Sequence, residues 1–245
     1  MQKFDGEKIL MAWESCRERP AQEGALALLA IAWPEQPTED LARLPLAKRN
    51  ALLLELRAVT LGRRMEGFTV CPECGAQLEF ILDARKLANE LHTPEVEAVG
   101  GGLTMRPANT RDLLACLDAD DEQQARSIML ARTLGFDEPD EKSDGHGSQE
   151  WLESLPETLP ADLLKRFDRL NASAEIRVRL HCAVCRSNPL VELDIAQFLV
   201  QEMIGAARRL MAEIHQLAKA YGWSEKSIAA MSGVRRIAYL EMLSA

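Results

Sequence analysis

Residues 68–83, FTVCPECGAQLEFILD, place a Cys-x-x-Cys turn between two short apolar runs. Residues 178–194, VRLHCAVCRSNPLVELD, repeat this order with a second Cys-x-x-Cys turn. An aspartate, Asp83 or Asp194, ends each stretch at the same distance from the second cysteine, where it can cap a following helix. The sequence therefore predicts the same unit twice: a β-hairpin that leads into a capped helix.

The four cysteines of these turns match the ligand set of a structural zinc site, and we predict that they bind one Zn²⁺: Cys71, Cys74, Cys182 and Cys185. Two residues between the cysteines let a turn direct both sulfurs at one ion, with Zn–S distances of about 2.3 Å. Gly75 suits the left-handed conformation that such a turn favours after its second cysteine, whereas the second turn has Arg186 there and departs from the pattern. Four thiolates fill a tetrahedral shell, so the prediction is a structural ion and not a catalytic one.

The sequence also allows other uses of its cysteines. A redox dithiol of the thioredoxin type opens a helix directly after a strand, whereas both pairs here lie in predicted hairpins. His181 is an alternative zinc ligand beside Cys182, although we expect it to be a strand residue that faces away from the sulfurs. Cys16 and Cys116 lie in helical patterns, and we expect small buried side chains at both positions.

The two cysteine pairs are about 107 residues apart, much farther than the halves of an ordinary zinc ribbon. Hydrophobic residues make up 47% of the chain and aromatic residues only 5%, and long stretches rich in Ala, Leu, Glu and Arg predict helices. We therefore expect a mainly α fold with a small β component, built around a split four-cysteine zinc ribbon. Closing the long loop through the metal is expected to stabilise this fold. The expected regions are an N-terminal helical region (1–64), the first zinc-knuckle hairpin and helix (65–92), a mostly helical insertion (93–174), the second zinc-knuckle hairpin (175–195) and C-terminal helices (196–245).

Apolar spacing of three and four residues predicts the individual helices. In the first half they cover residues 4–16, 22–33 and 44–62, the last one ended by Gly62. For the insertion we predict a linker (93–102), a strand and a helix capped by Asn109 or Thr110, a second helix (122–135), an acidic mobile loop (137–150) and a third helix (160–171).

The C-terminal region is predicted to hold a long helix from Ile195 and two shorter ones, the first of them capped by Ser224. Its stretch LAKAYGWSEKSIAAM (217–231) has the spacing of a helix-turn-helix motif, so a zinc-ribbon DNA-binding regulator is the alternative function. The segment SEKSIAAM lacks Arg, Asn and Gln to read base edges, which weakens this alternative. We expect Trp223, which precedes the capping serine, to be buried as a hydrophobic staple.

Charge and motif content narrow the remaining classes of function. The net charge of −9 disfavours non-specific binding to nucleic acid. The longest apolar run, residues 25–33, is too short to span a bilayer, and the first residues lack the apolar core of a signal peptide, so we expect a cytoplasmic protein. No phosphate-binding loop, HExxH or GxSxG motif occurs, so we expect no enzyme and no catalytic residues.

The order of the segments resembles a family of baseplate proteins from contractile-tailed phages, T-even-like baseplate hub assembly proteins among them, with relatives in tail-like contractile injection systems. The stretches that carry the resemblance are LPLAKRNALLLELRAVTLG (44–62) before VCPECGAQLEF (70–80), RPANTRDLLACL (106–117), AEIRVRLHCAVC (174–185), LDIAQFLVQEM (193–203) and the closing residues 213–243. The resemblance implies a structural or assembly role in the bacterial host cell or in the assembled particle. It implies other baseplate or tail-tube and spike proteins as partners, and neither nucleic acid nor a membrane.

Overall fold

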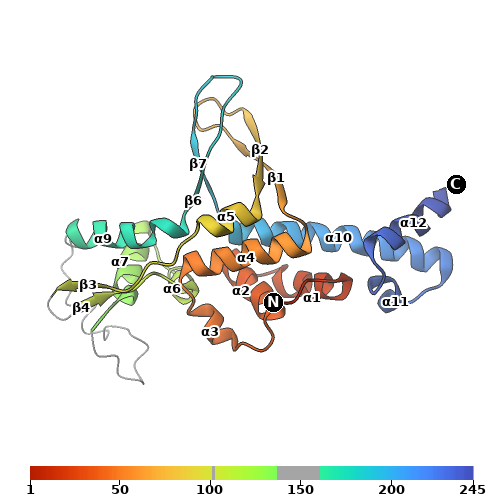
Figure 1. Ribbon diagram of the computed structural model, residues 1–245, viewed down its shortest axis with the longest axis horizontal. Coiled ribbons are helices and arrows are strands. Elements are labelled where there is room, and N and C mark those ends of the chain that lie inside the picture. Colours follow the sequence, from red (N-terminus) through yellow and green to blue (C-terminus); the bar gives the residue numbers. More distant parts are fainter. Residues whose placement is uncertain (101–102, 137–160, 245) are drawn as a thin grey trace.

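The computed structural model describes residues 1–100, 103–136 and 161–244, which form a mainly helical molecule with three small antiparallel sheets (Figure 1). The helices are α1 (Gly6–Cys16), α2 (Ala21–Ala32), α3 (Thr38–Ala42), α4 (Leu46–Thr60), α5 (Ala84–Glu90), α6 (Thr110–Ala115), α7 (Glu122–Thr133), α9 (Ala161–Asn171), η1 (Ala172–Ala174), α10 (Ile195–Tyr221), α11 (Glu225–Ala229) and α12 (Gly233–Ser244). The strands are β1 (Arg64–Val70), β2 (Gln77–Asp83), β3 (Glu97–Gly100), β4 (Leu103–Met105), β5 (Leu134–Phe136), β6 (Ile176–Arg179) and β7 (Leu190–Leu193).

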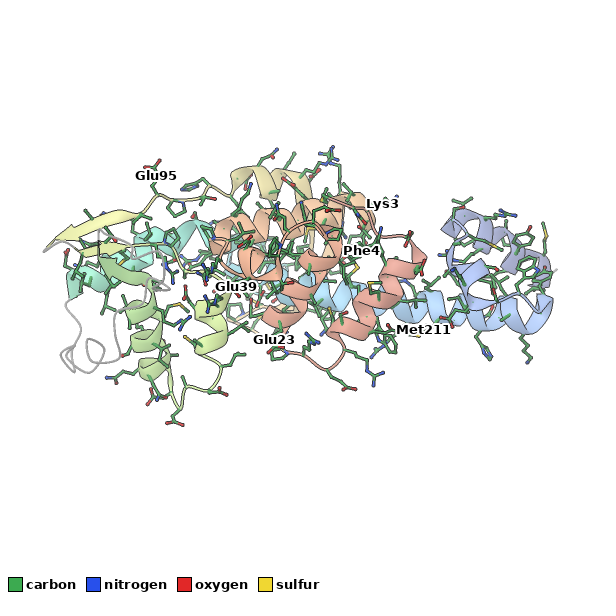
Figure 2. All side chains as sticks on the ribbon, turned by 90° about the horizontal axis from the view of Figure 1, so that it is seen from below. Lys3, Phe4, Glu23, Glu39, Glu95 and Met211 are labelled. Carbon is green, nitrogen blue, oxygen red and sulfur yellow. The ribbon has the colours of Figure 1, made fainter. Side chains whose placement is uncertain are left out.

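The main hydrophobic core lies where α1, α2 and α4 pack against α10, the longest helix in the described part of the chain. Leu28, Leu53 and Leu199 are fully buried there, one from each of α2, α4 and α10. Phe4, labelled in Figure 2, is also buried in this core, and its backbone N–H donates to Thr60 Oγ1 over 3.3 Å. The core therefore joins the N-terminal region to the helix that follows the second hairpin.

The helix starts follow the predicted capping chemistry. Asp83 and Asp194 accept hydrogen bonds from the first backbone N–H groups of α5 and α10, as their positions after the two hairpins predict. Asn109 caps α6 in a reciprocal capping box with Asp112, and Ser224 caps α11. These four confirmed caps fix where the helices begin relative to the strands and turns before them.

The inserted segment folds around a second, smaller core. β4 pairs with both β3 and β5, and α7 and α9 contribute the buried residues Leu130 and Leu170. The carboxylate of Asp112, with no solvent exposure, accepts hydrogen bonds from Arg106 and Arg132 over 2.7–3.1 Å. This ionic cluster joins α6, α7 and the chain after β4.

Three elements differ from the sequence-based expectations. β3 lies within the segment predicted to be a linker. It is a strand because its backbone forms hydrogen bonds to β4, and the glycine-rich sequence does not predict this pairing. The short strand β5 includes Leu134 and Gly135, which were predicted to end the helix 122–135, because pairing with β4 ends α7 at Thr133. The five-residue helix α3 was not predicted. The predicted acidic loop at 137–150 lies outside the described residues.

At the C-terminal end, α11 and α12 pack against the distal part of α10, set apart from the main core (Figures 1 and 2). Gly222 ends α10 in the left-handed conformation. Trp223 was predicted to be buried, but it is only half-buried. Its ring stacks on the exposed Tyr221, with ring centroids 4.5 Å apart, and meets Tyr239 edge-on. Within the described residues, no helix is both long and apolar enough to cross a membrane.

Candidate metal centre

Two antiparallel hairpins, β1–β2 and β6–β7, project from the same side of the helical body (Figure 1). Their bases enter the main core through Met65 and Ile176, which are both buried. Their turns carry the four cysteines of the two Cys-x-x-Cys motifs. Segments about 107 residues apart in the sequence therefore meet at the tip of one projection.

An ionic contact lies at the base of the first hairpin. Arg57, only 4% exposed, forms two hydrogen bonds to the carboxylate of Glu202 on α10, over 2.7 and 3.0 Å. The same guanidinium donates to the backbone carbonyls of Gly62 and Arg64 at the start of β1, over 2.5 and 2.7 Å. One side chain thus joins α4, β1 and α10 at the point where the hairpin leaves the body.

A glycine lets the first hairpin lie close to α10. A Cβ atom added to Gly67 would lie 2.5 Å from the ring of Phe80 and 3.1 Å from the ring of Phe198. The centroids of those two rings are 6.3 Å apart, so Phe80 of the hairpin and Phe198 of α10 contact each other beside Gly67. Neither Arg57 nor Gly67 stood out in the sequence, since both act through residues distant in the chain.

The two cysteine turns have the same backbone geometry. The N–H of Gly75 donates to the carbonyl of Cys71 over 2.9 Å, and the N–H of Arg186 donates to the carbonyl of Cys182 over 2.8 Å. Gly75 has φ 72° and Arg186 has φ 61°, so the arginine takes the left-handed conformation usually left to glycine. Arg186 therefore differs from Gly75 only in its side chain and not in its backbone conformation. Holding an arginine in the left-handed conformation costs about 1–2 kcal/mol.

The four sulfur atoms converge at the tip, all within 4.8 Å of one another. Sγ of Cys71 lies 3.8 Å from Sγ of Cys185, and Sγ of Cys74 lies 3.6 Å from Sγ of Cys182. Four sulfurs placed tetrahedrally at 2.3 Å from one Zn²⁺ are about 3.8 Å apart, whereas a disulfide bond is about 2.05 Å long. The spacing of the thiols thus fits a shared ion and not a pair of disulfides.

The surroundings of the four sulfurs shift the pKa values of the thiols in opposite directions. The Ser187 hydroxyl, 3.0 Å from the Cys185 sulfur, lowers the pKa of that thiol to about 6. Although a hydrogen bond from the Ala76 backbone lowers it, burial and the neighbouring thiols raise the pKa of Cys74 to about 12. Four adjacent thiols do not all ionise readily, because the negative charges of the thiolates would repel one another. A bound dication would offset this repulsion. Ser187 is a contributor that the sequence did not single out.

The remaining candidates lie apart from the tip cluster. His181 lies after the end of β6 and is therefore not the strand residue that was predicted. Its Nδ1 is hydrogen-bonded to Asn188 Oδ1 over 3.0 Å, and His181 is not among the grouped ligand atoms. Cys16 is buried as predicted, and burial raises the pKa of its thiol to about 11. Cys116 is only half-buried, contrary to the prediction, because it lies at the wall of a cavity.

Residues 6–200 of the chain match a protein family described as T4 bacteriophage base plate protein. The matched range includes both hairpins and all four cysteines of the tip. No curated protein and no solved structure was found that matches the chain.

Proposed function

The chain belongs to the T4 bacteriophage base plate protein family, and we propose on this basis that it builds or helps to assemble the baseplate of a contractile phage tail or tail-like injection system. In this proposal it acts through contacts with other baseplate or tail-tube and spike proteins. The family match over residues 6–200 is the observation that carries the proposal. A role in catalysis is not part of it.

We further propose that Cys71, Cys74, Cys182 and Cys185 hold one structural Zn²⁺. Sulfur spacings of 3.6 and 3.8 Å support a tetrahedral four-thiolate shell. When bound, such an ion supplies crosslinking alone, because four protein ligands leave no position for water or substrate. The chain's own residues supply the rest: the turns aim the sulfurs, and Ser187 stabilises the thiolate of Cys185.

DNA binding through the helix-turn-helix-like segment is less well supported. α11 has five residues, little more than one turn of helix, and its Ile228 and Ala229 are buried. A recognition helix has to place several side chains along the major groove. A helix this short with its apolar residues packed inward is better suited to closing the C-terminal core.

Co-expression tests the assembly role directly. The full chain is produced together with the tail-tube, spike and other baseplate proteins of the same genome, and complexes are isolated by size-exclusion chromatography. A stable complex with at least one of these proteins is expected. Failure to associate with any of them would contradict the proposed function.

A further inference from the structure

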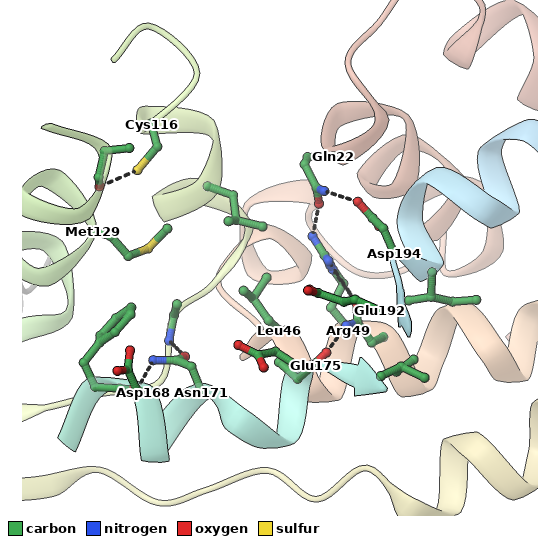
Figure 3. Close-up of a pocket in the computed structure, with 18 of the residues that line it drawn as sticks. Gln22, Leu46, Arg49, Cys116, Met129, Asp168, Asn171, Glu175, Glu192 and Asp194 are labelled. Atoms are coloured by element: carbon green, nitrogen blue, oxygen red, sulfur yellow. Dashed lines mark hydrogen bonds between the residues drawn. The ribbon is translucent and has the colours of Figure 1, made fainter. Parts of the chain in front are cut away.

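A cavity of about 510 Å³ lies where the inserted segment meets the body formed by α4 and the start of α10 (Figure 3). Its walls come from α4, α6, α7, α9 and the strands β6 and β7. The apolar part of the lining includes Leu46, Leu113, Met129, Phe167 and Ile195. A hollow of this size and lining can take one or two large side chains of another molecule.

Carboxylates outnumber cations around this cavity. The acidic lining residues are Glu122, Asp168, Glu175, Glu192 and Asp194, against the two arginines Arg49 and Arg126. Of these carboxylates, Asp168 is ion-paired with Arg126 over 3.3 Å and Asp194 caps α10. Figure 3 shows Glu175 and Glu192 at the edge of the cavity near Leu46 and Arg49. Glu192 is exposed and makes no ion pair within the described part of the chain. Glu175 is ion-paired with Arg177, which lies opposite Glu192 in the β6–β7 register.

The buried arginine in the wall donates its hydrogen bonds to neutral groups. Arg49 is 3% exposed and donates to Asn50 Oδ1 over 2.9 and 3.1 Å and to Gln22 Oε1 over 2.5 Å. Among the described residues no carboxylate lies within ion-pair distance of it. With its donors held by amide oxygens and carboxylates around it, Arg49 does not make this an anion site, and the charge of the cavity favours a cation.

We propose that this cavity docks a segment of a baseplate partner protein that presents a lysine or arginine beside a bulky apolar side chain. The apolar residue and the aliphatic stem of the basic residue lie against Leu46, Leu113 and Phe167, and the charged end meets Glu175 and Glu192. The inference rests on the proposed function, since it names the surface through which one of those protein contacts is made.

The test uses the partner found by co-expression and measures its affinity by isothermal titration calorimetry. The double variant Glu175→Gln/Glu192→Gln removes both charges with little change in shape, and Glu55→Gln/Glu90→Gln is the matched control, because Glu55 and Glu90 are exposed and line no part of the cavity. We expect at least a tenfold loss of affinity for the first variant and less than a twofold change for the second.

Cys116 reports whether the cavity itself is occupied, because its half-buried thiol lines the wall. Its rate of alkylation by N-ethylmaleimide, followed on the Cys116 peptide by mass spectrometry, should fall at least fivefold in the complex. A partner that binds both variants equally and leaves Cys116 reactive overturns the docking site but not the assembly role. The partner segment at the cavity is identified by chemical crosslinking and mass spectrometry, and a segment without a basic residue overturns the proposed occupant. The absence of any partner overturns the proposed function together with this inference.

Discussion

Replacing Cys182 by serine should remove the metal from the protein and lower its stability by about 4 kcal/mol. The Cys182 sulfur is buried and lies 3.6 Å from that of Cys74, so the substitution takes one ligand from the point where the hairpins meet. The buried residues at this tip are Cys71, Leu78 and Cys182, with Ala76 and Leu180 beside them. Burying one leucine side chain contributes about 1.5–3 kcal/mol, so packing alone would not make up for the loss of the proposed ion there.

The magnitude follows from linkage. An ion that binds only the folded state stabilises it by about 4.1 kcal/mol when its free concentration is about 1,000 times Kd. Since about 1 kcal/mol shifts the Tm of a chain of this size by roughly 2–4 °C, we expect a decrease of about 8–16 °C. Zinc content is measured by inductively coupled plasma mass spectrometry and Tm by circular dichroism, on protein purified without chelator.

Cys116→Ser is the matched control for this substitution. Cys116 Sγ donates to the Ala125 carbonyl over 3.3 Å and lies outside the sulfur cluster, so this variant should keep its zinc and most of its Tm. A chelator should lower the Tm of the wild-type protein to that of Cys182→Ser and leave the variant unchanged. A Cys182→Ser protein with full zinc content, or with a Tm within 2 °C of wild type, would refute the structural-metal hypothesis.

Four further predictions concern the stability of the fold and its affinity for DNA. Asp112→Asn leaves Arg106 and Arg132 without their buried counter-charge, and should lower the free energy of unfolding in urea by about 3–5 kcal/mol; a change below 1 kcal/mol would contradict this role. Gly67→Ala should lower the free energy of unfolding by about 1–3 kcal/mol, because the added Cβ clashes with Phe80. As the control, Gly205→Ala should stabilise the protein by up to about 1 kcal/mol, because its added Cβ meets only the end of Arg209 at 3.5 Å. Equal effects of the two substitutions would show that the clash with Phe80 does not destabilise the fold. Arg186→Gly should stabilise by about 1 kcal/mol with unchanged zinc content, because it relieves the left-handed backbone at φ 61°; a loss of stability would mean that the arginine side chain contributes more than the strain removes. Binding of the full chain to duplex DNA at physiological salt should be undetectable by fluorescence anisotropy, and sub-micromolar, sequence-dependent binding would revive the regulator alternative.

The elements that could be predicted from the sequence are those whose determinants lie close together in it. Asp83, Asn109, Asp194 and Ser224 each accept a hydrogen bond from a backbone N–H within three residues, so the helix starts could be predicted from the local sequence. Only for α6 did the sequence leave two caps open, Asn109 and Thr110. The repeated order of strand, cysteine turn, strand and aspartate predicted two hairpins. It also predicted that the four thiols would meet, and their spacing agrees, while the bound ion itself stays a prediction.

The elements that were missed depend on partners far away in the chain. β3 and β5 are three or four residues long and exist because β4 lies between them. In the sequence Arg57 is one of several charged residues on an amphipathic helix. Its role depends on Glu202, which is 145 positions later in the chain. Local sequence patterns carry no information about these pairings.

The place of the cysteines in the fold gives a physical link between the candidate ion and assembly. Each hairpin has only two strands, which is marginal for independent stability in water. β1 has seven residues and extends about 23 Å, so the main core, which holds its base through Met65, does not reach its tip. An ion at the tip would fix the distal ends of both hairpins to each other, and the projection would then be held at both ends. Such an arm has less conformational entropy to lose on meeting a partner protein than two independent hairpins have, so the metal would increase affinity without touching the partner.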